Sequence, residues 1–323
     1  MAVTTNTIQT YDRKGLREDL TNLISNLSPT ETPFYSNSGR GKCTAVLHEW
    51  QTQALATAAT NNAKVQGDNW QSFGSRAATV RVGNYTQIAG KNAIVSGTAE
   101  AVDAAGRADE MDYQMMLISK EVKRDMETGI LSANAAGSAG NSSTAAVAAG
   151  PLAWVKTNVD YYTTDGGNPA WTSGVPSAVR TDGGTLRAFT ESQLKAVIAL
   201  GYANGANFST LMVGPFNKGA FSAFSGVATK TFYTDQAGPT KVIGSADVYV
   251  GNFGNLAVVP NRFQRERDAW LIDFDMVSFP FLRPFFTQPL PQGDFKANAL
   301  ICEYTLQVKN ELGLGLVADL TTA

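Results

Sequence analysis

One long amphipathic segment, residues 107–133, constrains the fold more than any other part of the chain. Its apolar side chains recur at steps of three or four residues, which places them on one face of a helix: Met111, Met115, Ile118, Val122, Met126 and Ile130. At a rise of 1.5 Å per residue, such a helix spans roughly 40 Å and exceeds the average globular helix. The sequence therefore predicts a rod whose apolar stripe packs on another element, either as a scaffold or as an ordinary core helix.

Composition indicates a globular protein and disfavours several classes of function. The 323 residues are 43% hydrophobic and 17% charged, enough for one large or two modest domains with a sizeable core. The chain has 26 basic and 28 acidic residues, and this net charge of -2 disfavours a protein that reads DNA. Neither a signal-peptide pattern nor an apolar run near roughly 18 residues is present. We therefore expect no membrane partner, and a protein kept in the cytosol or in a particle assembled there.

Cysteine usage points away from disulfide or zinc chemistry. Cys43 and Cys302 are the only two cysteines, and they lie far apart in the sequence. We expect both to be small buried hydrophobic residues, and we expect no metal and no cofactor.

The first hundred residues predict an arm and a long two-stranded hairpin. Residues 12–27 have the spacing of a short amphipathic helix, which Ser28-Pro29 ends. Residues 43–56 and 79–94 have strand patterns and flank a polar stretch. A two-stranded hairpin is marginal alone in water, so this one needs a partner surface, such as another copy of the chain.

The rest of the chain alternates helix and strands in mixed order, which predicts an α+β fold. Residues 135–185 are rich in small and polar residues and predict an irregular insertion with Trp154 and Trp171 as isolated anchors. A capping pattern at Thr190 and Gln193 predicts a helix over 190–204. Strand patterns then cover 208–213, 242–250, 256–259, 270–282 and 298–309, followed by the mostly apolar run 312–320.

Catalytic candidates are few. His48 is the only histidine, so a nucleophile and base pair must use it, with Glu49 as its acidic neighbour. Asp273 and Asp275 alternate with Phe274, so on a strand they share one face and form a second acid/base candidate. An exposed strand face explains this spacing equally well. The sequence thus assigns no catalytic, cofactor-binding or metal-binding residue.

Charged stretches give only weak signals for partners. Residues 39–42 (GRGK) lack the spacing of a phosphate-binding loop and predict a solvated turn. Residues 262–268 carry both signs of charge and predict an interface or a solvated turn. Acidic residues Asp12, Glu18 and Asp19 lie among the basic residues of 12–19 and cancel most of their charge, so any DNA contact there should be weak and independent of sequence.

Several motifs, in this order, resemble the major capsid proteins of tailed bacteriophages, of a podovirus type within the Hong Kong 97-type fold. The resemblance spans nearly the whole chain. It is carried by AVDAAGRADEMDYQM (101–115), AWVKTNV (153–159), LMVGPFNK (211–218), VVPNRFQRERDAWLID (258–273), LRPF (282–285) and EYTLQVKNELGLGLVADL (303–320).

This resemblance implies a division of the chain into named parts. They are an N-terminal arm (1–42), an extended β-hairpin loop (43–97), a peripheral domain (98–189) with spine helix 107–133 and insertion 135–185, an axial domain (190–260), and return strands of both domains (261–323). Some relatives form a covalent cross-link between a lysine of this loop and an asparagine of a neighbouring subunit. Lys64 and Lys91 lie in the corresponding region, but the sequence assigns no acidic residue that would catalyse the bond. We therefore predict no cross-link.

The resemblance also implies a function. It is that of a subunit assembling into pentamers and hexamers of an icosahedral phage head, built in the host cytoplasm around double-stranded DNA. Implied partners are copies of the chain, a portal, a separate scaffolding protein, since no scaffolding segment precedes the arm, and a minor or cement protein on the insertion. The alternatives are an encapsulin-like nanocompartment shell, an enzyme using His48 with Glu49 or Asp273 with Asp275, and a tail or baseplate component.

Overall fold

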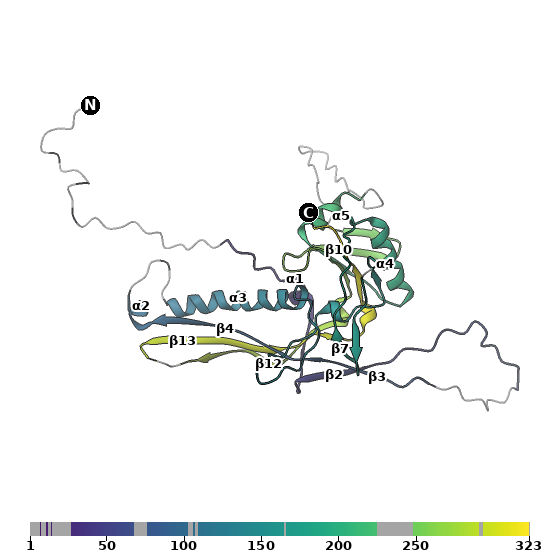
Figure 1. Ribbon diagram of the computed structural model, residues 1–323, viewed down its shortest axis with the longest axis horizontal. Coiled ribbons are helices and arrows are strands. Elements are labelled where there is room, and N and C mark those ends of the chain that lie inside the picture. The colour runs from purple at the N-terminus through teal and green to yellow at the C-terminus, as the bar shows by residue number, and fades with distance from the viewer. Residues whose placement is uncertain are drawn as a thin grey trace.

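Two β-sheets and one long helix form the body of the molecule, and a two-stranded arm projects from it (Figure 1). The computed structural model describes residues 27–67, 76–102, 106, 109–164, 166–224, 248–290 and 293–322, with single residues 7, 11 and 14. The amphipathic helix expected over 12–27 lies almost entirely outside these residues.

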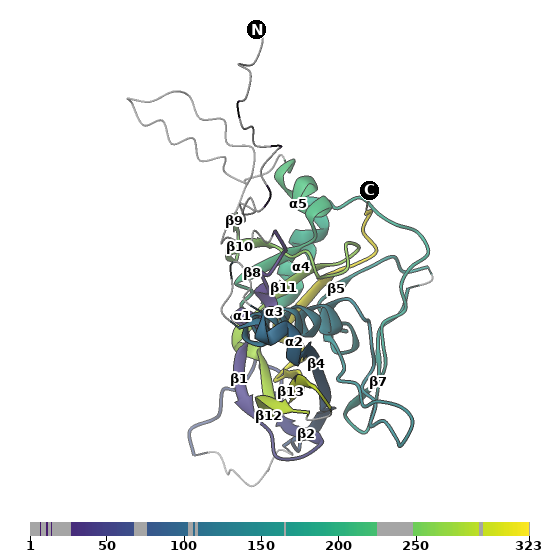
Figure 2. The same cartoon turned by 90° about the vertical axis from the view of Figure 1, so that its left-hand side faces the viewer.

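The first sheet is long and carries the helix on one face (Figures 1 and 2). Its strand order is β1-β12-β13-β4, with β14 paired to β12. The strands are β1 (Gly39–Lys42), β4 (Gln87–Ser96), β12 (Val277–Pro289), β13 (Phe295–Tyr304) and β14 (Gln307–Val308). Helix α3 (Glu110–Leu131) lies along β4 and β13, and the short helices α1 (Pro33–Asn37) and α2 (Gly97–Ala101) lie beside it.

The long helix is confirmed, with ends a few residues inside the expected ones. Asp109 caps its first turn, because the carboxylate accepts a hydrogen bond from the backbone N–H of Asp112 at 2.9 Å. The expected apolar stripe is buried apart from half-buried Met115, and its residues from Met115 to Ile130 share one core with strand residues such as Cys302 and Tyr304. The stripe thus packs on the first sheet.

The second sheet forms the compact part of the molecule. Its order is β5-β15-β11-β8-β10-β9. The strands are β5 (Val159–Asp160), β8 (Thr210–Val213), β9 (Val248–Gly251), β10 (Gly254–Pro260), β11 (Ala269–Ile272) and β15 (Leu314–Val317). Helix α4 (Glu191–Ala203) begins at the predicted capping box of Thr190 and Gln193, and α5 (Pro215–Ser222) follows β8. Leu194 and Val197 of α4 and Phe221 of α5 complete this second core.

The expected hairpin of residues 43–97 is wrong in its extent. Only β2 (Leu47–Thr52) and β3 (Val80–Tyr85) pair with each other. Strand β4 follows β3 directly and pairs with β13 over its whole length, from Gln87 against Tyr304 to Ser96 against Phe295. The apolar alternation continues through both strands, so pattern alone does not mark where the chain changes partner.

The strand expected over 270–282 is divided between the two sheets. A short 3-10 helix, η3 (Phe274–Met276), separates β11 in the second sheet from β12 in the first. The insertion 135–185 is mostly irregular, as expected. It contains the one-turn helix η2 (Pro151–Ala153) and the hairpin of β6 (Ala170–Thr172) and β7 (Val175–Ala178). Another one-turn helix, η4 (Glu311–Gly313), precedes β15.

Candidate assembly surfaces

The β2–β3 arm has a firmly held base. The side chain of Asn84, fully buried, donates to the carbonyls of Ala149 and Leu306 at 3.1 and 2.8 Å and accepts from the N–H of Ala149. Gly174, at φ +82°, accepts from the N–H of Gly83, and a side chain there would collide with the backbone of β3. Both contacts fix the arm to the insertion and the first sheet.

Three tryptophans reinforce this base. The ring of Trp154 lies 5.3 Å from Trp50 of β2 and 5.3 Å from Trp171 of β6, measured between centroids. Trp154 is buried, and Trp171 donates its indole N–H to the carbonyl of Ala153. The sequence predicts Trp154 and Trp171 as isolated anchors, and this prediction is wrong. With Trp50 they form one cluster of tilted and edge-on rings, called the tryptophan stack below.

Beyond its base, the arm exposes apolar side chains. Leu55 is 96% exposed, Val65 is 80% exposed and Val80 is 58% exposed. All three side chains lie on the segment that projects from the body, where another protein chain could cover them. This arm is the first candidate assembly surface (Figure 1).

A buried carboxylate on α3 joins three distant segments. Glu127 accepts hydrogen bonds from the N–H groups of Phe34 and Tyr35 at 2.9 and 2.7 Å, and from the side-chain amide of Asn261 at 2.7 Å. Burial raises the pKa of Glu127, although these three donors act in the opposite direction. Glu127 thus positions α1 and the end of β10 on the long helix.

Within residues 262–268, exposed Arg262 points to solvent, but Arg265, Arg267 and Asp268 belong to a largely buried ionic cluster and not to a solvated turn. Asp268 and Asp319 are fully buried, and Arg265 pairs with Asp268 at 3.4 Å. Arg267 donates to Asp319 at 2.7 Å, and buried Arg180 lies 3.5 Å from the same carboxylate. The cluster connects the insertion, the segment after β10 and the C-terminal residues.

The pKa values of the two buried carboxylates of this cluster shift in opposite directions, because the carboxylate of Asp319 accepts hydrogen bonds and that of Asp268 does not. Burial raises the pKa of Asp268 to about 7, even with Arg265, Arg180 and Arg267 near it. Burial alone would also raise the pKa of Asp319, but the N–H groups of Tyr162 and Gly183 and the guanidinium of Arg267 lower it below its ordinary value.

His48 and Glu49, the first catalytic candidates, do not act together. They are neighbours on β2, so their side chains point to opposite faces. Glu49 makes two hydrogen bonds to Arg81 at 2.6 and 2.7 Å. Burial lowers the pKa of His48, whose ring packs 5.7 Å from Trp50.

Asp273 and Asp275, the second candidates, do not share a strand face as expected. Asp273 caps η3 and accepts from the N–H of Asp275 at 3.1 Å, whereas the Asp275 side chain is exposed. The chain turns here because Val277 must enter the other sheet. Asp273 and Asp275 therefore belong to the turn between β11 and β12 and do not form an acid/base pair.

Other sequence candidates also have structural places. Residues 39–42 form β1, parallel to β12, and not the expected turn. Cys43 and Cys302 are buried free thiols, as expected. Lys64 is exposed beyond β2, whereas Lys91 on β4 forms ion pairs with Glu121 and Asp125 of α3.

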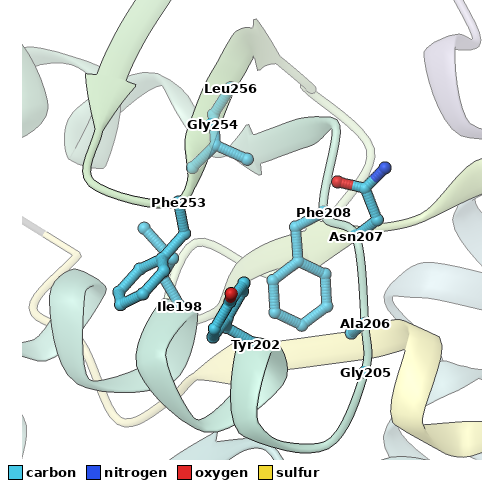
Figure 3. A pocket seen from close by; sticks show the side chains of 9 residues that line it. All are labelled: Ile198, Tyr202, Gly205, Ala206, Asn207, Phe208, Phe253, Gly254 and Leu256. Atoms are coloured by element: carbon cyan, nitrogen blue, oxygen red, sulfur yellow. The ribbon is translucent and has the colours of Figure 1, made fainter.

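A cleft of about 240 Å³ lies between α4 and the β9–β10 hairpin (Figure 3). Tyr202 and Phe253 stack at its edge with centroids 4.5 Å apart, and Ile198 and Phe208 line it. Gly201 is required here, because a side chain would collide with the Phe208 ring. The cleft is mainly apolar, its polar side chains are the phenol of Tyr202 and the amide of Asn207, and it contains no acid/base pair.

The described residues meet neither the requirement for a metal site nor that for a membrane-spanning helix. They contain no group of three histidine, cysteine, aspartate or glutamate residues that could hold a metal ion. Within the same residues, no helix combines the length and apolar character needed to cross a membrane.

Comparison with known proteins assigns the chain to a family. A family model described as the SU10 major capsid protein matches residues 3–321. The major capsid protein of Escherichia phage Phieco32 is 41% identical over 125 residues, which cover 39% of this chain and 35% of that protein. That match therefore spans about a third of the relative's length.

Solved structures resemble the fold along nearly the whole chain. A chain of the cyanophage A-1(L) capsid aligns with a TM-score of 0.65 at 11% identity, covering 97% of this chain and 98% of that one. A chain of Gordonia phage Cozz gives 0.59 at 11% identity, covering 99% and 98%. The holo-SrpI encapsulin complex from Synechococcus elongatus gives 0.57 at 10% identity, covering 95% and 94%. The chain belongs to the SU10 major capsid protein family and has the Hong Kong 97-type fold of phage capsid subunits.

Proposed function

We propose that this major capsid protein assembles into pentamers and hexamers of an icosahedral phage head that encloses double-stranded DNA. In this proposal α3 is the spine helix, the β2–β3 arm is the extended loop, and the second sheet with α4 and α5 is the axial domain. The first sheet and the insertion form the peripheral domain. Assembly takes place in the host cytoplasm, with a scaffolding protein, a portal and a minor or cement protein as further partners.

The β2–β3 arm is the observation that supports this proposal most. Its base is fixed by buried Asn84 and the tryptophan stack, while its outer residues expose Leu55 and Val65 to solvent. An arm that is held at its base and buries little of its own apolar surface is stabilised when a neighbouring subunit covers it. Head-to-tail contacts of this type close into rings when the rotation between subunits allows it.

An encapsulin-like shell around a protein cargo is the second candidate. The likeness to the SrpI encapsulin complex favours it, because the same fold builds that assembly. The two candidates differ in contents. Double-stranded DNA inside purified particles selects the phage head, and a packaged protein selects the nanocompartment.

Shortening the arm tests the assembly proposal. Residues 53–79 are replaced by an Asn-Gly turn, which joins β2 to β3 directly and keeps the tryptophan stack. The circular dichroism of the variant should match the wild type, but electron microscopy should show no closed particles. The control variant replaces exposed Lys64 by Gln and should still assemble. Closed particles from the shortened variant would contradict the assigned role of the arm.

A further inference from the structure

Helix α3 has its acidic and basic side chains sorted onto different faces. Lys91 of β4 forms ion pairs with Glu121 at 3.1 Å and with Asp125 at 2.8 Å. These contacts hold both carboxylates on the flank of the helix next to the sheet, and they keep the pKa of Lys91 raised. One of the two negative charges in this part of α3 is therefore compensated by Lys91 at the helix-sheet boundary.

The basic residues of the same turns point away from the sheet. Lys120, Lys123 and Arg124 have the spacing of one helix face, opposite the buried residues Ile118 and Val122. Lys120 and Lys123 are exposed and Arg124 is half-buried. None of the three forms an ion pair with any residue that the structure describes. Counted with Lys91, Glu121 and Asp125, they leave an excess of two positive charges.

We propose that Lys120, Lys123 and Arg124 form a phosphate-contacting patch through which each subunit binds the backbone of the packaged double-stranded DNA. The net charge of -2 for the whole chain conceals this local excess. The inference rests on the proposed function, because the duplex is the polyanion that a phage head encloses.

The placement of α3 explains why such binding would not depend on sequence. A helix reads bases when it enters the major groove, but α3 is packed along β4 and β13 (Figure 1). On its other side, residues 28–30 line a small pocket together with Lys120 and Arg124, so α3 cannot enter a groove as a free helix. Lysine and arginine on a helix side held in this way can reach phosphates and not base edges. The three residues span about 6 Å along the helix axis, within which a duplex carries several phosphates.

A small number of phosphate contacts per subunit is sufficient for a shell made of many subunits. Three phosphate contacts give weak binding for one chain, but copies in one shell bind the same polymer together. A weak and repeated contact retains the DNA without fixing its path.

Chromatography of the full-length chain on immobilised duplex DNA tests the patch. The triple variant Lys120→Gln, Lys123→Gln, Arg124→Gln is compared with the wild type and with a charge-matched control, Lys42→Gln, Lys64→Gln, Arg76→Gln. All three control residues are exposed and lie on β1 or beyond β2 and before β3. Retention is measured over a salt series from about 50 to 200 mM.

The wild type and the control should be retained at low salt, and the patch variant should elute much earlier. Loss of three phosphate contacts should reduce the slope of log affinity against log salt by about 2 to 3. Equal losses in both variants, or no retention of the wild type at about 50 mM salt, would overturn the proposal. Stronger retention on poly-glutamate than on DNA would instead assign the patch to an acidic protein.

Electron microscopy of the same proteins separates this inference from the proposed function. Closed particles from a patch variant with unchanged DNA retention would refute the patch alone. A wild-type chain that forms no closed particles under any condition would refute the proposed function.

Discussion

Glu127, Asp268 and Asp319 are buried carboxylates that connect segments far apart in the sequence. Glu127 directly follows the stripe residue Met126, and a glutamate next to such a stripe is a weak signal of burial. The run 262–268 gives no such signal, because its charges equally suit a solvated turn. Their partners, Phe34 and Arg180 among them, are defined only by tertiary contacts, so sequence reasoning missed these joints.

Substitution of Glu127 tests the joint on α3. Glu127→Ala leaves the N–H groups of Phe34 and Tyr35 without a partner, and we expect a loss of about 3 kcal/mol in the free energy of unfolding. Glu127→Gln keeps the shape but turns an amide N–H₂ toward a donor, so its loss should be smaller. Urea unfolding measures both. Partly exposed Glu121→Ala is the control, and an equal loss there would contradict the account.

Asp319→Asn tests the buried ionic cluster. The residue lies at φ +60°, which asparagine tolerates, so the substitution removes charge without backbone strain. Arg180 and Arg267 then lose their buried partner, and we expect a loss of about 3 to 5 kcal/mol, measured by urea unfolding. If the Asp319→Asn variant were as stable as the wild type, the ionic cluster would be solvated and the account would be contradicted.

Asp268 should make stability depend on pH. Its pKa in the folded chain, about 7, exceeds the ordinary value of 3.8, so the folded state binds this proton more tightly than the unfolded chain. The resulting stabilisation is complete below about pH 4 and is lost as pH rises through about 7. Asp268→Asn should therefore be more stable than the wild type at about pH 8 and lose this part of the pH dependence. Exposed Asp275→Asn should keep the wild-type profile.

At the scale of elements, the two longest helices were predictable, whereas the short helices α1, α2 and α5 and the strand partners were not. Periodicity and capping residues are local, and both α3 and α4 appear within a few residues of their predicted ends. Strand pairing is decided across the chain, so the change of partner between β3 and β4 and the turn at η3 left no local mark. Because of the same turn, Asp273 and Asp275 do not share one face of a strand, as an acid/base pair there would require.

The tryptophan stack should decide whether the β2–β3 arm is held in place. Trp154→Ala removes the buried ring between Trp50 and Trp171, and we expect a loss of about 3 to 5 kcal/mol. Trp154→Phe should lose less, because it keeps most of the packing. Hydrogen exchange should then be faster in β2 and β3 than in β4, whose ladder with β13 is intact. Uniform protection in all three strands would contradict this.

On the scale of the whole molecule, two packed cores support an arm that they do not cover. Glu127 and the ionic cluster connect the segments between the cores, so the body can hold the arm at a defined angle. The exposed arm and the basic side of α3 then remain available for other molecules. This arrangement suits a subunit whose remaining stabilisation comes from its neighbours.

Cryo-electron microscopy of particles formed by the full chain tests the central claim most directly. The account predicts closed icosahedral shells in which residues 53–67 of each copy contact a neighbouring copy and Leu55 and Val65 are buried. A shell, or a stable monomer, in which these residues remain exposed or fold back on their own subunit would contradict it.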